Sequence, residues 1–186
     1  AEITGLNEHS SDNQSAVAYL HQQLIAEAKA RKQPDQALIL MSHAQMQGGE
    51  TSDSERPIVV GNEEALSTAL FDEVLDYVAL GHLHKPQQVG QPHIRYSGSP
   101  IPLSFSELNY KHQVLEVRID PLQADAQRFQ YESLLIPRTV ELLRIRCELS
   151  ELITELNQLP KDEIAEVCAR HFLEIEYVSD APPPID

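Results

Sequence analysis

Two short apolar runs in this chain each lead into histidine. Residues 37–42 (ALILMS) are followed by His43, and residues 77–80 (YVAL) are followed by Gly81 and then by His82 and His84. Short apolar runs bounded by turn residues are typical of buried strands. Because residues two apart in an extended segment point the same way, the rings of His82 and His84 are predicted to converge. Ligands gather outside the carboxyl ends of strands in open α/β sheets, so we expect all three histidines at one sheet edge.

The segments around these strands alternate between helical and extended patterns. Ser11 or Asp12 is placed to cap a helix that ends before Pro34. Its apolar positions recur at spacings of three and four residues and predict an amphipathic helix that covers a sheet. They are Val17, Leu20, Leu24, Ile25 and Ala28. A polar loop over residues 44–56, interpreted as substrate-facing, precedes a short strand at 57–60 and a helical turn capped by Asn62. This alternation predicts an α/β layered fold.

Residues 94–107 (IRYSGSPIPLSFSE) combine two prolines, one glycine and four serines. This composition predicts a loop without regular structure, whose free backbone N–H groups would suit a phosphate. Ser97, Gly98 and Ser99 are therefore candidate phosphate-binding residues, although a rigid turn explains the composition equally well. Residues 112–119 and 127–135 flank a turn and predict a β-hairpin that closes the first domain.

Pro137 marks a predicted domain boundary, which gives one domain over residues 1–136 and a second over 137–186. The second reads as a strand (140–147), a helix capped by Ser150 (150–159), a short helix (161–169) and a strand (172–178). The last residues, 180–186 (DAPPPID), predict an extended polyproline-like tail. Its abrupt finish suggests that the chain was cut there.

Composition restricts the function classes further. The 186 residues are 41% hydrophobic, enough for one core and part of a second domain. A net charge of −15 excludes a broad basic surface for nucleic acid, so any DNA contact must be local. Cys147 and Cys168 form no Cys-x-x-Cys pair, which argues against a disulfide framework or structural zinc. The sequence shows neither an apolar run of about 20 residues nor a signal-peptide pattern, so we expect no membrane association and a cytoplasmic location.

The histidines carry the candidate chemistry, because imidazole is the commonest metal ligand in proteins. For an isolated His-x-His pair, one packed and one solvated ring is the favoured interpretation. The third histidine, at the end of a neighbouring strand, shifts the balance toward a metal site.

Four segments together resemble one protein family. SHAQ around His43, DYVALGHLHKPQ from Asp76 and RYSGSPIPLSFSE from Arg95 are similar to the later motifs of calcineurin-like metallophosphoesterases. The SGSP stretch narrows the resemblance to SbcD-type nuclease subunits, bacterial relatives of the eukaryotic double-strand-break repair nuclease, and SDSER from Ser52 agrees with that branch.

This resemblance implies the C-terminal half of a layered β-sandwich with flanking helices, followed by the start of a small α+β DNA-capping domain. It further implies a two-metal phosphodiesterase, with manganese favoured over magnesium. Such an enzyme acts as exonuclease and endonuclease on DNA ends and hairpins, in DNA repair, recombination and replication. The implied partners are an SbcC-type ATPase and a second copy of the subunit. By family pattern, His43 and His82 would bind one ion and His84 the other.

The sequence also departs from the family pattern. The Asp-x-His, Gly-Asp-x-x-Asp and Gly-Asn-His-Asp motifs, which supply the bridging carboxylate and the acid histidine, are absent, and GNEE at 61–64 is no substitute. Three histidines alone cannot hold two divalent ions, so we expect an internal piece of a longer nuclease that is inactive by itself. Two alternatives stay open: a phosphodiesterase acting on a small molecule, and a non-catalytic binding or scaffold module.

Overall fold

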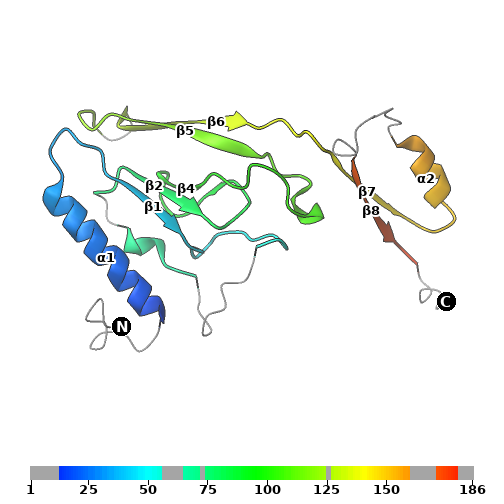
Figure 1. Cartoon of the computed structure of the whole chain (residues 1–186), viewed down its shortest axis with the longest axis horizontal. Helices are drawn as coiled ribbons and strands as arrows, with labels where there is room; N and C mark the ends of the chain where they lie inside the picture. Colours follow the sequence, from blue (N-terminus) through cyan, green and yellow to red (C-terminus); the bar gives the residue numbers. More distant parts are fainter. Residues whose placement is uncertain (1–12, 56–64, 72–73, 125–126, 160–170, 180–186) are drawn as a thin grey trace.

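The computed structural model describes residues 13–55, 65–71, 74–124, 127–159 and 171–179. In these residues the chain is a mixed α/β protein built around a four-stranded sheet of order β1-β2-β4-β3 (Figure 1). Strands β1 (Ile39–His43), β2 (Tyr77–Gly81) and β4 (Ile94–Tyr96) are parallel. The short β3 (Gln87–Gln88) pairs antiparallel with β4. The two predicted strands at 37–42 and 77–80 are thus confirmed and lie side by side; the first begins two residues later and ends one residue later than predicted, and the second is one residue longer.

One face of the sheet carries α1 (Asn13–Arg31) and the 3₁₀ turn η2 (Thr68–Leu70). Ile25 is buried there, whereas Leu20 and Leu24 are exposed, so the predicted apolar stripe is only partly right. The reason is the rotation of the helix: His21, not Leu24, faces the sheet. Its Nε2 lies 3.0 Å from Ser42 Oγ, and its ring meets the edge of Phe71.

The opposite face carries the hairpin of β5 (Gln113–Ile119) and β6 (Phe129–Leu135), which confirms the predicted hairpin (Figure 1). The ring of Tyr77 stacks on that of Phe129 with centroids 5.5 Å apart. At the start of β2 the carboxylate of Asp76 pairs with the guanidinium of Arg128. These contacts fix the hairpin to the amino end of β2. The carboxyl ends of β1 and β2 remain at the other edge of the sheet.

The serine-rich stretch 94–107 is more regular than predicted. It begins with β4 and ends with the 3₁₀ turn η3 (Phe105–Glu107), because Ile94 and Tyr96 are buried in the core and supply the strand's inward face. Several predicted features lie outside the described residues: the Ser11 or Asp12 cap, the strand at 57–60, the Asn62 cap, the helix at 161–169 and the tail at 180–186.

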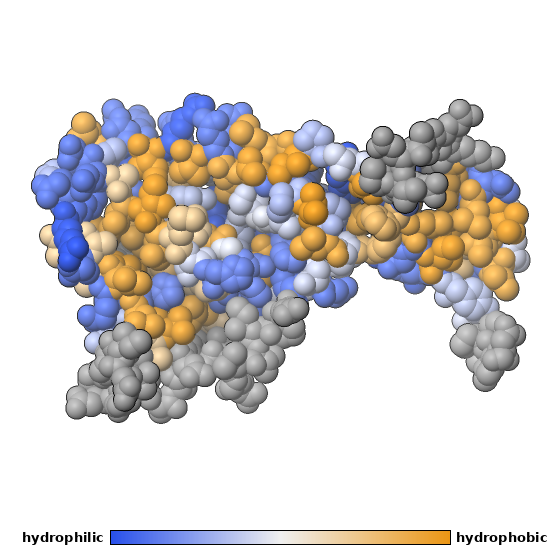
Figure 2. Space-filling model, viewed as in Figure 1, coloured by the Kyte–Doolittle hydropathy of each residue, from blue (hydrophilic) through white to orange (hydrophobic). Residues whose placement is uncertain are grey.

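A second body follows the hairpin, with β7 (Leu142–Cys147), α2 (Leu152–Gln158) and β8 (Phe172–Tyr177). Strands β7 and β8 form a parallel pair. The predicted Ser150 cap is wrong: Glu151 occupies the N-cap position, because a backbone-bonded turn from Glu148 precedes the helix. Apolar side chains on this body are exposed, among them Phe172, Ile153 and Ile175. Figure 2 shows this body as a largely apolar surface.

Candidate functional site: a histidine cluster at the ends of two parallel strands

His43 and His82 meet at the carboxyl edge of the sheet. His43 is the last residue of β1, and its register partner on β2 is Gly81, which directly precedes His82. The two imidazole centroids lie 5.4 Å apart with the rings at 73°. A Cβ atom on Gly81 would stand only 3.0 Å from His43 Nδ1, so the missing side chain leaves room for the His43 ring. The topology therefore places two imidazoles side by side.

His82 adopts a backbone conformation that is rare for a residue with a side chain. Its φ is +105°, and within the described part of the chain it alone has a positive φ without being glycine. Such strained residues cluster at binding and catalytic sites, where the surrounding structure holds them in place. Burial lowers the pKa of His82, and the neighbouring His43 lowers it further, against an opposing effect of Glu55. His82 thus tends toward the neutral form, which is the form that binds metals.

His84 lies two residues further on and is held by hydrogen bonds. Its Nδ1 is 2.8 Å from Glu107 Oε1 and 2.8 Å from Ser54 Oγ. Its backbone N–H donates to Glu55 Oε1 at 2.7 Å. The side chain is 19% exposed. His84 thus follows the carboxyl end of β2 and is anchored through its backbone N–H and through the Nδ1 edge of its ring.

The predicted phosphate loop packs against the backbone of His84. The Ser99 N–H donates to His84 O at 3.0 Å, and the Ser99 hydroxyl lies 3.4 Å from Glu107 Oε2, so neither is free as the composition suggested. Gly98 has φ +89°, and a Cβ there would meet His84 O at 2.7 Å. Ser97 Oγ donates to Gln113 O. Contact with phosphate by Ser97, Gly98 or Ser99 stays a prediction, while support of His84 is what the geometry provides.

Two carboxylates of this region, Glu55 and Glu107, were not identified from the sequence as candidate site residues. Glu107 is completely buried and Glu55 accepts hydrogen bonds from the N–H groups of His84 and Ser52. Burial alone would raise the pKa of both, but the hydrogen bonds they accept outweigh it and hold each pKa below its usual value. The only signal was that both lie within motifs carrying the family resemblance, SDSER and SFSE. A glutamate in a serine-rich stretch otherwise suggests a solvated side chain.

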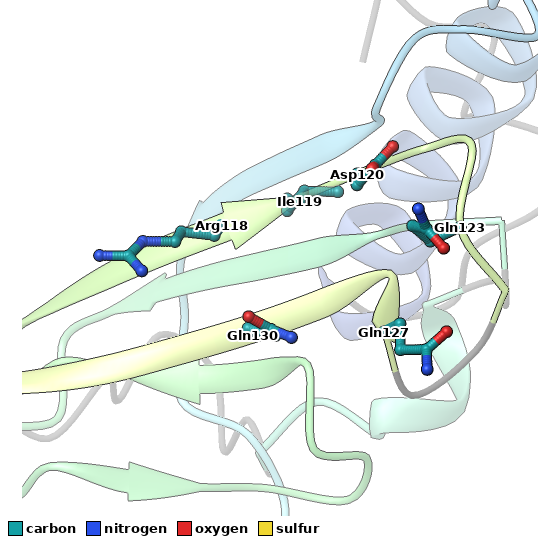
Figure 3. A pocket seen from close by; sticks show the side chains of 6 residues that line it. All are labelled: Arg118, Ile119, Asp120, Gln123, Gln127 and Gln130. Atoms are coloured by element: carbon teal, nitrogen blue, oxygen red, sulfur yellow. The ribbon is translucent and has the colours of Figure 1, made fainter.

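A polar depression lies at the edge of the sheet opposite to the histidines. Figure 3 shows it at the turn of the hairpin, next to the start of β2, lined by Arg118, Ile119, Asp120, Gln123, Gln127 and Gln130. That is the amino edge of the sheet, whereas the histidines follow the carboxyl ends. The pocket therefore does not belong to the histidine site.

The donors at the histidine site suit part of a metal centre. Imidazoles fit manganese and other divalent first-row ions when carboxylates complete the coordination. Among the described residues, no group of three or more His, Cys, Asp or Glu converges on a single position for an ion. Among the described residues His43 and His82 thus form a pair of neighbouring imidazoles, and a metal site at this pair stays a prediction.

The fold and the site together define a class of protein: a mixed α/β protein with histidines at the ends of adjacent parallel strands. The chain is similar to the SbcD component of the SbcCD nuclease from Rhodobacter capsulatus, with 34% identity over 168 residues. That stretch is 86% of this chain and 40% of the relative. The predicted resemblance to SbcD-type nuclease subunits is thereby confirmed.

No protein-family model matches the chain. In the described residues, no helix is both long enough and apolar enough to cross a membrane.

Proposed function

We propose that this chain is the part of an SbcD-type nuclease subunit that contributes His43, His82 and His84 to a two-ion phosphodiesterase site. The main support is the pair of imidazoles of His43 and His82 at the ends of adjacent parallel strands, with ring centroids 5.4 Å apart. One of them, His82, has a strained backbone conformation. Ions in such sites lie about 3.5–4 Å apart, so ligands from neighbouring strands are at a suitable spacing. Manganese is the preferred ion and magnesium the alternative.

The missing ligands belong, in this proposal, to the part of the subunit that this chain does not represent. The chain spans about 40% of the length of the relative it matches. Bound divalent ions polarise a phosphodiester and activate water. The residues of this chain would hold the ions through neutral imidazoles and orient His84 through its hydrogen bonds. The substrate would be DNA at ends and hairpins, with an SbcC-type ATPase and a second copy of the subunit as partners.

The acidic composition is compatible with this function if DNA contacts are local. With a net charge of −15, the chain cannot attract phosphates over a broad surface. Bound divalent ions are often the largest local charges in a site and invert its electrostatics. Affinity for DNA is therefore expected to depend on the metal more steeply than in a basic DNA-binding protein.

The test compares the 186-residue chain with a full-length subunit that contains it. The full-length protein should cut hairpin and linear DNA with Mn²⁺, and His82→Ala should reduce both Mn²⁺ affinity and cleavage. The isolated chain should bind Mn²⁺ weakly and hydrolyse no phosphodiester. Full-length protein that cleaves only nucleotides would support a small-molecule phosphodiesterase. Unchanged Mn²⁺ affinity in His43→Ala and His82→Ala would reduce the chain to a scaffold module.

A further inference from the structure

Glu107 is the most deeply buried charged group among the described residues. Its exposed fraction is 0%, and it is the last residue of η3. An isolated carboxylate in such a place is costly unless hydrogen bonds compensate it. Five groups surround its two oxygens: the hydroxyls of Ser52, Ser54 and Ser99, the N–H of Leu103, and Nδ1 of His84. They come from three separate segments, and only one of them, His84, is a candidate ligand.

The hydrogen-bond pattern fixes the proton on one nitrogen of His84. An ionised carboxylate only accepts, so the 2.8 Å contact between Glu107 Oε1 and Nδ1 needs a proton on Nδ1. The Ser54 hydroxyl donates its proton to Glu107, so its oxygen is left to accept from the same Nδ1. Both partners therefore require a proton on Nδ1. In the neutral ring, which is the form that binds metals, Nε2 then carries the free lone pair, and it makes no hydrogen bond to the described residues.

We propose that Glu107 is a positioning residue for the metal site: it fixes the tautomer and the ring orientation of His84 so that Nε2 is presented as a ligand. This inference rests on the proposed function. Histidines that bind metals commonly donate their other ring N–H to a carboxylate, which orients the ring and raises its basicity. Glu107 itself contacts neither substrate nor ion in this assignment. The hydroxyls of Ser52, Ser54 and Ser99 and the N–H of Leu103 hold Glu107 in turn and so fix the orientation of its carboxylate toward His84.

The first measurement reads the His84 tautomer directly, without metal. Long-range ¹H–¹⁵N NMR on the 186-residue chain should show the Nδ1–H form of His84 as the single species. In Glu107→Ala the signals should shift to a mixture of both tautomers. Glu107→Gln, which preserves the shape, serves as the second variant if Glu107→Ala is poorly folded, and its side-chain amide should likewise weaken the preference. Glu116→Gln is the matched control, because the Glu116 carboxylate pairs with the exposed Arg118 on the hairpin and lies outside the histidine site.

The second measurement is Mn²⁺ affinity by calorimetry on the same variants. Loss of such a carboxylate partner typically costs about 10–100-fold in metal affinity, and we expect this range for Glu107→Ala, with a smaller loss for Glu107→Gln. Glu116→Gln should leave the affinity unchanged. If His82→Ala weakens Mn²⁺ binding but both Glu107 variants retain affinity and tautomer, the inference is wrong and the proposed function stands. If neither His82→Ala nor the Glu107 variants alter Mn²⁺ binding, the proposed function itself fails.

Discussion

Among single residues, Gly81 is constrained by the close approach of the His43 ring. A Cβ at this position would approach His43 Nδ1 to 3.0 Å, closer than the ring tolerates without moving. Gly81→Ala should therefore displace His43 from His82 and lower Mn²⁺ affinity on the order of 10-fold, the lower end of what loss of ligand support costs. The fold itself should not suffer, because alanine suits a strand better than glycine by roughly 0.5–1 kcal/mol.

Calorimetry and urea unfolding separate these two effects. The reverse change on the same strand, Ala79→Gly, is the control: it should lower the free energy of unfolding by roughly 0.5–1 kcal/mol and leave Mn²⁺ affinity as it was. Gly81→Ala with full Mn²⁺ affinity would mean that the His43 ring adapts without loss and that its position is not critical.

Asp76 makes stability depend on pH. Its side chain is 3% exposed, pairs with Arg128 and accepts the N–H of Leu38 at 2.7 Å. Burial alone would raise the pKa of Asp76, but the hydrogen bonds from Arg128 and Leu38 hold it below its usual value. A depressed pKa in the folded state stabilises the protein above the unfolded pKa of about 3.9, and this contribution disappears as the pH falls through the folded pKa.

Asp76→Asn should consequently lower the free energy of unfolding near neutral pH by about 1–3 kcal/mol, the cost of weakening a buried charged hydrogen bond. As the pH falls below the unfolded pKa of about 3.9 and through the depressed folded pKa, the difference between the two proteins should shrink, since Asp76 then becomes neutral in both states of the unsubstituted chain. Urea titrations at several pH values measure this. A constant difference across that range would show that Asp76 contributes through shape rather than charge. The control Glu116→Gln, on an exposed pair, should change stability by less than about 0.5 kcal/mol.

At the scale of elements, short apolar runs in the sequence correctly predicted the parallel strands β1 and β2. Val78 and Leu80 of β2 are buried, and the strand and its parallel partner β1 follow from the sequence. The buried face of α1 does not follow from the sequence, because Ile25 and His21 rather than Leu24 turn toward the sheet. The apolar positions of the helix are compatible with either rotation about its axis. Local pattern gives the period of a helix, while tertiary contacts choose its orientation.

The same limit applies to the site. His43, His82 and His84 could be proposed from their places after two strands, and the adjacency of His43 and His82 follows from the strand order. The anchoring of His84 by Glu107 could not, because the two partners are 23 residues apart and two of the serines that donate hydrogen bonds to the buried carboxylate, Ser52 and Ser54, lie more than 50 residues before it. The positive φ of His82 likewise has no signature in the sequence, since Gly81 beside it would have been the expected position.

The second body makes a prediction about its own elements. Strands β7 and β8 pair only with each other among the described residues, and α2 covers them while Phe172, Ile175 and Tyr177 stay exposed. A core this small stabilises weakly. Amides of Leu142–Cys147 should therefore exchange with deuterium faster than those of Tyr77–Gly81. Equal protection in hydrogen-exchange experiments would mean that the two bodies unfold as one unit and that a boundary at 137 is misplaced.

Across the whole molecule, the second body is connected to the segment that carries Glu107. Arg138, one residue past the predicted boundary, donates from Nη2 to Leu108 O at 2.7 Å and to Tyr110 O at 3.0 Å. Arg144 of β7 reaches Phe105 O at 3.2 Å. Two arginines thus satisfy carbonyl groups in and just after η3. The segment that carries Glu107 is thus held from both sides, by His84 and the serines on one side and by these arginines on the other.

Arg138→Ala tests this connection. The side chain is 19% exposed, and its removal leaves the carbonyls of Leu108 and Tyr110 without their charged donor, at a cost of about 1–3 kcal/mol in the free energy of unfolding. Amide exchange around residues 105–110 should accelerate while β2 stays protected. Mn²⁺ affinity should fall less than in Glu107→Ala, because the carboxylate that orients His84 is still present. Arg118→Ala, on the exposed hairpin, is the control and should change none of these quantities. If Arg138→Ala leaves exchange at 105–110 unaltered, the arginine joins the two bodies without supporting η3, and the histidine site is independent of the second body.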